Sequence, residues 1–414
     1  MNRIKLGDIL QIKHGYAFKS ENYVKNSPYA LVTLANISGS NNFQFTPDKT
    51  TYYGATFPDE FKLYEDDLIM PLTEQVVGLF GNSAFVPKIK GMQFVLNQRV
   101  GKVIPKGEKA DKYYLHYLLS TDIVRDQLEY RASGTRQRNI SPSDVYDVTV
   151  FIPDIKTQRK IGKTLYDIER KININNQIND NLQHQLKLMY DYWFTQFDFP
   201  DENGKPYRSS GGAMVWNEQL KRNIPVNWKA DNLYAVADYV NGLACQNYRP
   251  DDDNHKLPVI KITEMHNGIT DSTEFVRDDI PVKYIIEDGD ILFSWSATLE
   301  TMLWYGGKGG LNQHIFKVVP KCPKFFAYSQ LSAYIINFKT IAESRKTTMG
   351  HITTDHMEQS RIAIPPIEVQ TAFNTQVSPL YDQIAINCKE NIRLQALRDW
   401  LLPMLMNGQA TISD

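Results

Sequence analysis

The chain has 414 residues, too many for one ordinary domain of about 100–200 residues, so two to four units are expected. Apolar residues make up 42% and charged residues 22%, which fits a folded globular protein and excludes a disordered or collagen-like chain. The 46 basic and 47 acidic residues leave a formal net charge of −1, so binding to nucleic acid would have to come from local basic patches.

Residues 1–153 are expected to form a globular α+β domain. Short β-rich runs such as YALVTLANI, DLIMPL and QFVLNQRVGKVI are separated by turns rich in Gly, Pro, Asn and Asp. A single helix is expected in the later stretch YYLHYLLSTDIVRDQLEY, residues 113–130.

Residues 154–197 are predicted to form a long helical spacer. Apolar residues and two asparagines recur at alternating spacings of four and three, which is typical of a coiled-coil seam. A helix of roughly 35 residues would be about 50 Å long. The seam positions are Ile161, Leu165, Ile168, Ile172, Asn175, Asn179, Leu182, Leu186, Met189 and Trp193.

After a connector at residues 198–228, rich in Gly, Pro, Ser and Asn, the plan repeats in a globular region at 229–365 and a helical spacer at 366–408. The stretches LNQRVGKVIPK (96–106) and LNQHIFKVVPK (311–321) are identical at seven of eleven places. Every seam position of the first spacer recurs 212 residues later. The second seam is Phe373, Val377, Leu380, Ile384, Asn387, Asn391, Leu394, Arg398, Leu401 and Leu405.

Two prolines interrupt the second spacer. Pro379 lacks an amide donor and is expected to kink or start the second helix, and Pro403 is expected to mark its end. The first spacer has no such residue.

The paired asparagines predict how the two spacers pack. A buried asparagine at a seam costs stability but fixes register and orientation. Antiparallel helices in a two-fold repeated chain would place Asn175 near Asn391 and Asn179 near Asn387. We therefore expect these four side chains to meet near a pseudo-dyad.

The sequence suggests no catalytic residue and no metal site. The stretch IPPI at 364–367 lacks the polar group and the ring that an adenine methyltransferase needs. Asp154, Glu169 and Lys171 resemble a metal-dependent nuclease motif, but they lie on or beside the predicted coiled coil, where a solvated face is favoured. The run GGKGG at 306–310 lacks the spacing of a phosphate loop, so we expect a mobile turn that could still face DNA.

Cysteine usage and the amino terminus favour a cytoplasmic protein. Cys245, Cys322 and Cys388 lie far apart and form no Cys-x-x-Cys pair, so neither a disulfide framework nor a cysteine zinc site is expected. The start MNRIKLGDILQIKHG lacks the apolar core of a signal peptide, and no uncharged apolar run approaches about 20 residues. We expect no membrane span.

Two polar stretches at equivalent places in the repeat are candidate DNA-binding loops. Arginine can contact phosphate or guanine, and glutamine or asparagine can pair with adenine. Two different loops at equivalent places favour readers of two different sequences, and the alternative is an exposed polar loop that caps the next element. The candidates are Arg131, Arg136, Gln137, Arg138 and Asn139 in the first stretch, and Arg345, Lys346, Thr347, Thr348 and His351 in the second.

Four stretches carry a resemblance to a known family: LGDILQIKHGYAFKS, SGTRQRNISPSDVYDVTVFIPDIKTQRKIGKTL, YWFTQFDFPDENGKPYRSSGGAMVWNEQLKRNIPVNW and TTMGHITTDHMEQSRIAIPPIEVQ. With these motifs in this order, the chain resembles the specificity subunit of a type I restriction-modification system. The resemblance covers essentially the whole chain.

The resemblance implies an α+β architecture with an internal pseudo-two-fold repeat: two α/β target recognition domains, 1–153 and 229–365, separated by two long antiparallel helices, 154–197 and 366–408. Each domain would read one half of a bipartite, asymmetric site in double-stranded DNA, and the helices would set the spacing.

The resemblance also implies partners. Two modification subunits would bind S-adenosylmethionine and methylate adenine at N6, and a restriction subunit would translocate and cut DNA with ATP and Mg²⁺. This chain would hold no cofactor and make no bond itself.

Ile174 and Ile178 lie one helical turn apart outside the main seam and are candidates for the face that binds the modification subunits. Packing against this chain's own domains is the alternative. A stand-alone sequence-specific DNA-binding regulator, a self-contained nuclease and a coiled-coil scaffold are the other functions considered.

Overall fold

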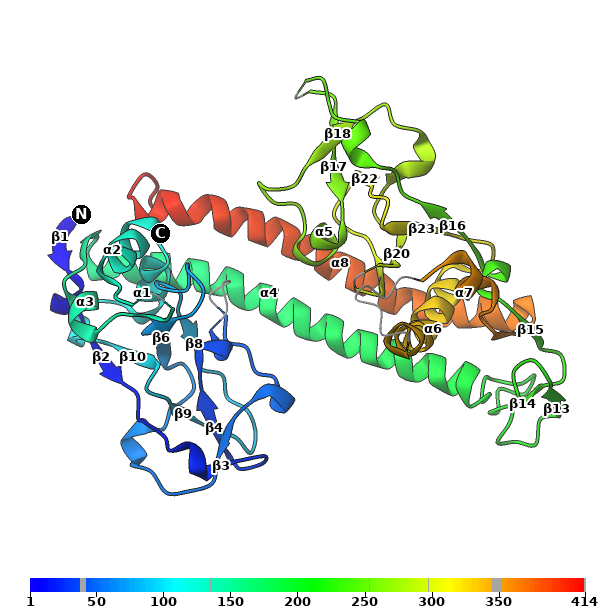
Figure 1. The fold of residues 1–414 in the computed structure, drawn as a ribbon, viewed down its shortest axis with the longest axis horizontal. Coiled ribbons are helices and arrows are strands. Elements are labelled where there is room, and N and C mark those ends of the chain that lie inside the picture. Colours follow the sequence, from blue (N-terminus) through cyan, green and yellow to red (C-terminus); the bar gives the residue numbers. More distant parts are fainter. Residues whose placement is uncertain (38–41, 135, 253, 297, 345–351, 413–414) are drawn as a thin grey trace. The chain divides into compact units, whose positions relative to one another are not determined.

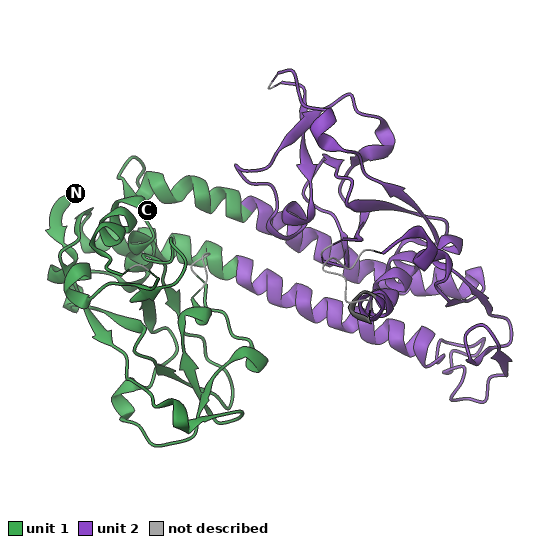
Figure 2. Cartoon of the chain, viewed as in Figure 1, with its two compact units in different colours: residues 1–171, 394–414 green, residues 172–393 purple. Residues whose placement is uncertain are grey.

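The computed structural model describes residues 1–37, 42–134, 136–252, 254–296, 298–344 and 352–412 (Figure 1). The chain divides into two compact units: unit 1 is residues 1–171 with 394–414, and unit 2 is residues 172–393 (Figure 2). The boundaries fall inside two long helices, α4 (Ile155–Tyr190) and α8 (Ile367–Met406), so each helix contributes to both units. In the described ranges, no helix is long and apolar enough to cross a membrane.

In the described part of unit 1, two four-stranded sheets form the β structure. The first has the order β2-β10-β6-β8 and is antiparallel, and the second has the order β3-β5-β4-β9, in which β4 and β9 run parallel. Strand β1 pairs with β12, and β7 pairs with β11. The strands are β1 (Asn2–Lys5), β2 (Leu10–His14), β3 (Tyr23–Val24), β4 (Tyr29–Val32), β5 (Tyr52–Tyr53), β6 (Leu68–Pro71), β7 (Thr73–Glu74), β8 (Ala84–Phe85), β9 (Gln93–Leu96), β10 (Val100–Pro105), β11 (Arg138–Asn139) and β12 (Thr149–Ile152).

The helices of unit 1 are α1 (Lys112–Leu119), α2 (Asp122–Arg131) and α3 (Pro142–Tyr146). The single helix predicted over 113–130 was wrong, because the chain turns at Ser120 and Thr121. Thr121 has extended backbone, and the two hydroxyls donate hydrogen bonds to carbonyls at the end of α1. The buried core of the unit joins side chains of α1 and α2 to Leu165 of α4 and Leu405 of α8.

Unit 2 repeats the strand order of the antiparallel sheet of unit 1 but not that of its second sheet, where the parallel pair is central instead of lying at one edge. Its antiparallel sheet has the order β16-β23-β20-β21, and its second sheet has the order β18-β17-β22-β19, in which β17 and β22 run parallel. The strands are β13 (Met214–Asn217), β14 (Arg222–Pro225), β15 (Lys229–Asp231), β16 (Ala237–Asn241), β17 (Lys256–Ile260), β18 (Phe275–Arg277), β19 (Ile285–Ile286), β20 (Ile291–Ser294), β21 (Glu300–Leu303), β22 (Gly309–Leu311), β23 (Ile315–Pro320) and β24 (Ile362–Ile364); the shorter helices are α5 (Ile262–Asn267), α6 (Lys324–Ser344) and α7 (Thr354–Glu358).

The run at 306–310 is not a mobile turn throughout. Gly309 and Gly310 are buried in β22, where a Cβ at Gly309 would meet the side chain of Ile260 and one at Gly310 would meet that of Val276. These glycines therefore let the second sheet of unit 2 pack closely.

Gly15 and Gly242 mark the same close contact in the two units. A Cβ at Gly15 would overlap the carbonyl oxygen of Asn97, and a Cβ at Gly242 would overlap that of Asn312. The next residue in each unit forms a parallel bridge to the same asparagine. The repeat therefore extends to a backbone contact that only glycine can make.

The predicted coiled-coil seam follows the packing of α4 and α8. Every predicted seam side chain is buried or half-buried. Pro379 and Pro403 both lie inside α8, so the predictions that Pro379 could start the helix and that Pro403 ends it were wrong, and a kink at Pro379 stays a prediction. An interior proline costs a helix about 3 kcal/mol, which burial of side chains such as Phe373 and Val377 offsets along so long a helix.

The predicted connector, residues 198–228, contains an ordered hairpin of β13 and β14. It joins the core of unit 2 through the buried rings of Phe199 and Trp228, whose centroids lie 5.3 Å apart. The ring of Trp228 also packs against Phe194 and Phe197, which follow α4.

We predict that Gly15→Ala and Gly242→Ala each lower the free energy of unfolding by about 3 kcal/mol or more, because the added methyl group meets backbone rather than a movable side chain. Urea unfolding measures the effect. Gly91→Ala is the matched control: Gly91 has φ +80° but open space around the added Cβ, so only backbone strain of about 1 kcal/mol is expected. Equal losses in all three variants would contradict the role given to the close contacts.

Candidate nucleic-acid interface

Arg138 is tied into the fold of unit 1. Its Nη1 lies 2.9 Å from Oε1 of Glu74, whose side chain is 1% exposed, and its Nη2 donates to the carbonyl of Glu129 at 2.9 Å. The other oxygen of Glu74 accepts hydrogen bonds from the backbone amides of Leu79 and Phe80. Arg138 therefore neutralises a buried carboxylate that shapes the turn after β7.

Asn139 and Arg131 also hold the loop in place. Oδ1 of Asn139 accepts a hydrogen bond from Oγ1 of Thr73 at 2.9 Å, and its backbone exchanges two hydrogen bonds with Ser133. The guanidinium of Arg131 donates to the carbonyls of Gln127 at 2.8 Å and Asp147 at 3.3 Å. Three of the five candidates in the first loop are thus engaged with the protein itself.

Arg136 and Gln137 remain at the surface of the loop. Arg136 is exposed, and among the described residues none forms a hydrogen bond or ion pair with it. Gln137 is half-buried, and its amide nitrogen lies 3.3 Å from Oδ1 of Asn139. An arginine with a free guanidinium beside an amide side chain can contact phosphate and base edges.

The structure adds exposed apolar side chains that the sequence alone did not single out. Tyr130, at the end of α2, is 90% exposed, and Val76 and Val77 are 78% and 67% exposed. Both valines follow β7, which pairs with β11 of the arginine loop. An exposed aromatic ring and exposed methyl groups can contact bases. The adjacent valines at 76 and 77 were the feature of the sequence that could have indicated this surface.

The candidates of the second loop lie outside the described residues. They are Arg345, Lys346, Thr347, Thr348 and His351. Its described carboxyl-terminal flank is anchored. Ile352 is 2% exposed, and its amide donates to the carbonyl of Trp295 at 3.1 Å.

The structure brings the four seam asparagines together in unit 2. Nδ2 of Asn175 lies 2.9 Å from Oδ1 of Asn391, and Nδ2 of Asn387 lies 2.8 Å from Oδ1 of Asn179. All four side chains are buried. As the residue number rises by four along α4, its partner's number falls by four along α8, so the predicted antiparallel packing is confirmed here.

Ile174 and Ile178 are 40% and 39% exposed on α4. Ile386, which lies 212 residues after Ile174, is 60% exposed on α8. The described fold of unit 2 therefore leaves these apolar side chains open to solvent.

The proposed nuclease residues do not form a site. Asp154 caps the start of α4, where hydrogen bonds from Thr157 and other groups lower its pKa. Glu169 lies fifteen residues further along, a separation of about 22 Å at ~1.5 Å per residue. That distance is too great for one metal ion. Among the described residues, no group of three or more His, Cys, Asp or Glu could hold a metal ion.

Glu169 instead belongs to a buried network. It accepts a hydrogen bond from the hydroxyl of Tyr117 at 2.8 Å and lies 3.4 Å from Nε2 of His116. Burial opposes its charge, but the hydrogen bond and charge of His116, the hydroxyl of Tyr117 and the charge of Arg398 together lower its pKa. This carboxylate joins α1, α4 and α8 within unit 1.

Comparisons with known proteins agree with this geometry. A family model described as the type I restriction modification DNA specificity domain matches residues 1–184 and 225–396. The type I restriction enzyme MjaIX specificity subunit of Methanocaldococcus jannaschii is 23% identical over 340 residues, which cover 77% of this chain and 73% of the relative. The HindI specificity subunit of Haemophilus influenzae is 22% identical over 67% of this chain and 72% of its own length.

A solved structure shares the fold. The crystal structure of the type I restriction-modification system S subunit from M. genitalium aligns with 100% of this chain and 96% of its own, with a TM-score of 0.61 and 14% identity. At that identity the likeness concerns the fold alone.

We predict that Asn179→Leu lowers the free energy of unfolding by about 1–3 kcal/mol, because the buried amide of Asn387 loses its acceptor. The double variant Asn179→Leu with Asn387→Leu should recover most of this loss, since both polar groups are then gone. Denaturant unfolding of the wild type, both single variants and the double variant gives the coupling free energy. Asn181→Ala, at an exposed position on the same helix, should change stability by less than about 0.5 kcal/mol. Additive losses in the double variant would contradict the pairing.

Proposed function

Because the chain belongs to the family of type I restriction modification DNA specificity domains, we propose that its two globular regions, residues 1–153 and 229–365, each read one half of a bipartite, asymmetric DNA site. The chain is a DNA-recognition subunit of a type I restriction-modification system. The observation that carries this function is that the family match spans both halves of the repeat. A stand-alone regulator is not favoured, because the similar proteins are specificity subunits.

The duplicated architecture supports reading of two different half-sites. The two units share the strand order of the antiparallel sheet, one parallel strand pair in the second sheet and the glycine contacts, so they can present equivalent loops. The loops themselves differ in sequence: YRASGTRQRNIS in unit 1 corresponds to ESRKTTMGHIT in unit 2. In this proposal the shared scaffold positions the loops, and the differing side chains read different bases.

In unit 1 we assign contact with DNA to Arg136 and Gln137, together with Tyr130 and the valine turn at 76–77. Arg131, Arg138 and Asn139 act indirectly by holding the loop. The candidates of the second loop, at 345–348 and 351, are proposed as their counterparts for the other half-site.

The helices carry the second part of the proposal. Helices α4 and α8 each contribute residues to both units. The asparagine pairs oppose sliding of one helix along the other, because a slip would leave buried amides unpaired. We propose that this fixed register sets the spacing between the half-sites.

Catalysis is assigned to partner proteins. We propose that this chain makes no bond and holds no cofactor, that two modification subunits bind S-adenosylmethionine and methylate adenine, and that a restriction subunit uses ATP and Mg²⁺. The separation of Asp154 from Glu169 along α4 supports the absence of a nuclease centre at those residues.

We predict that mapping methylated adenines in a host carrying this chain and its partners yields a motif of two fixed blocks around unspecified bases. Arg136→Ala should weaken methylation about tenfold or more, or relax one block only, because one base or phosphate contact is worth ~1–3 kcal/mol. The unfolding midpoint should not change, since Arg136 has no described partner. Lys156→Ala, at an exposed lysine, should leave the motif intact. A single undivided motif would reject the bipartite function, and an unchanged motif in the Arg136→Ala variant would reject the role of Arg136 alone.

We predict that Ile174→Asp with Ile178→Asp reduces the amount of modification subunit recovered with this chain in a pull-down, because charges replace exposed apolar contacts. Gln183→Asp with His184→Asp is the matched control, since it adds the same two acids at exposed positions on the same helix. Recovery at full stoichiometry with the isoleucine variant would remove these residues from the interface.

A further inference from the structure

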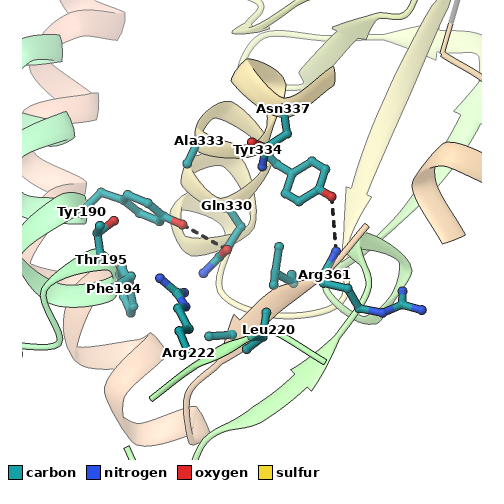
Figure 3. Close-up of a pocket in the computed structure, with 12 residues that line it drawn as sticks. Tyr190, Phe194, Thr195, Leu220, Arg222, Gln330, Ala333, Tyr334, Asn337 and Arg361 are labelled. Carbon is teal, nitrogen blue, oxygen red and sulfur yellow. Dashed lines mark hydrogen bonds between the residues drawn. The ribbon is translucent and has the colours of Figure 1, made fainter. Parts of the chain in front are cut away.

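A pocket of about 330 Å³ lies in unit 2 (Figure 3). It is formed by the carboxyl end of α4, the β13–β14 hairpin, α6 and β24. The volume equals roughly ten water molecules at their share of the liquid, and it falls within the range of small-molecule sites. Aromatic and aliphatic side chains form part of the wall, and polar side chains form the rest. The first group is Tyr190, Phe194, Leu220, Ala333, Tyr334, Ile362 and Ala363, and the second is Thr195, Arg222, Gln330, Asn337 and Arg361.

The pocket contains a cation without a counter-charge. Arg222 is half-buried, with its guanidinium 5.0 Å from the ring centroid of Phe197. Among the described residues, none accepts a hydrogen bond from this guanidinium or forms an ion pair with it. Burial lowers its pKa, as expected of a cation removed from water. The described lining includes neither Asp nor Glu.

A second donor faces the same space. Gln330 is 3% exposed, and its Oε1 accepts a hydrogen bond from the hydroxyl of Tyr190 at 3.0 Å. This bond directs the amide nitrogen away from Tyr190. Figure 3 shows that nitrogen and the guanidinium of Arg222 turned toward the same part of the pocket. Two donors that converge with no acceptor between them fit a ligand that supplies one.

Two other polar side chains of the wall, Tyr334 and Arg361, already have partners. The hydroxyl of Tyr334 accepts a hydrogen bond from the amide of Arg361 at 3.3 Å. The guanidinium of Arg361 donates to the carbonyls of Glu358 and Ser360, both at 2.8 Å. The available positive charge is therefore that of Arg222.

Unit 1 contains the equivalent pocket with different chemistry. Its volume is about 220 Å³, and it is largely apolar, with Leu118 at the place of Gln330 and the side chain of Met1 in its wall. Six lining residues lie 212 positions from six of the unit 2 pocket: Leu118 and Gln330, Thr121 and Ala333, Val150 and Ile362, Phe151 and Ala363, Met406 and Phe194, Asn407 and Thr195. Packing at this junction therefore does not require the polar donors, which are particular to unit 2.

We propose that the unit 2 pocket binds a small organic molecule bearing an oxyanion, either a phosphate or a carboxylate. The oxyanion lies between the guanidinium of Arg222 and the amide of Gln330, since guanidinium groups bind both anions in planar, paired geometry. The body of the ligand packs against Tyr190, Phe194 and Tyr334. A half-buried guanidinium stacked on a ring at a pocket wall suits a small ligand better than the backbone of a duplex.

Titration calorimetry of the full chain tests this site with two matched pairs of probes: adenosine monophosphate with neutral adenosine, and benzoate with neutral benzamide. We expect at least one anionic probe to bind at least tenfold more tightly than its neutral counterpart. The pair that shows the preference identifies phosphate or carboxylate. Arg222→Gln should abolish the preference, and Gln330→Leu, which introduces the residue of the unit 1 pocket, should reduce it at least tenfold.

Arg249→Gln, at an exposed arginine of the same unit, should leave binding unchanged. Thermal unfolding of each variant checks that it folds, and Gln330→Leu provides the test if Arg222→Gln does not. The proposal fails if neither anionic probe is preferred over its neutral partner, or if a folded Arg222→Gln variant keeps the preference. It also fails if a short DNA duplex displaces the bound probe and itself loses affinity in the Arg222→Gln variant, because the site would then belong to the DNA backbone.

Discussion

Four buried asparagines impose the constraint on which the helical part of this protein depends. In each pair across α4 and α8, the amide nitrogen of one asparagine donates to the amide oxygen of the other, Asn175 to Asn391 and Asn387 to Asn179. An apolar seam tolerates a slip of one turn, since one aliphatic side chain can replace another. Buried amides do not, because each unpaired group costs about 1–3 kcal/mol. Register is therefore fixed by polar groups within a mainly apolar contact.

The internal repeat separates what packing requires from what function can vary. Both units need a glycine where a strand end approaches an asparagine carbonyl, at Gly15 and Gly242, and both have the same strand order in the antiparallel four-stranded sheet. The recognition loops and the two junction pockets differ. Leu118 and Gln330 occupy equivalent places, one in an apolar pocket and one beside Arg222. The two units thus differ in sequence in the recognition loops and the junction pockets, where the shared packing does not require one particular side chain.

Charged groups in unit 1 show the same division of roles. Arg138 neutralises the buried Glu74, and Glu169 ties α1 to the long helices through Tyr117 and His116. Breaking a buried pair of this kind costs more than removing a surface charge. Arg136, exposed and without a described partner, can meet a ligand without loss to the fold. The buried pair of Arg138 and Glu74 thus stabilises the loop that contains the exposed Arg136.

The sequence by itself determined the duplication, the two long helices and the four asparagines, because seam periodicity and repeat offsets are properties of local spacing. The motifs of the sequence also indicated the family, and the family match confirms that resemblance. Local spacing did not give the ends of α8, since Pro379 does not start the helix and Pro403 does not end it, and the packing of α8 outweighs the local cost of proline. Only the tertiary structure decided which arginines are free, since the partner of Arg138 lies 64 residues away at Glu74. Only the tertiary structure also revealed the pocket that Arg222 and Gln330 line. One residue lies on a hairpin and the other on a helix, over a hundred residues apart, and no sequence spacing predicts that they line one pocket.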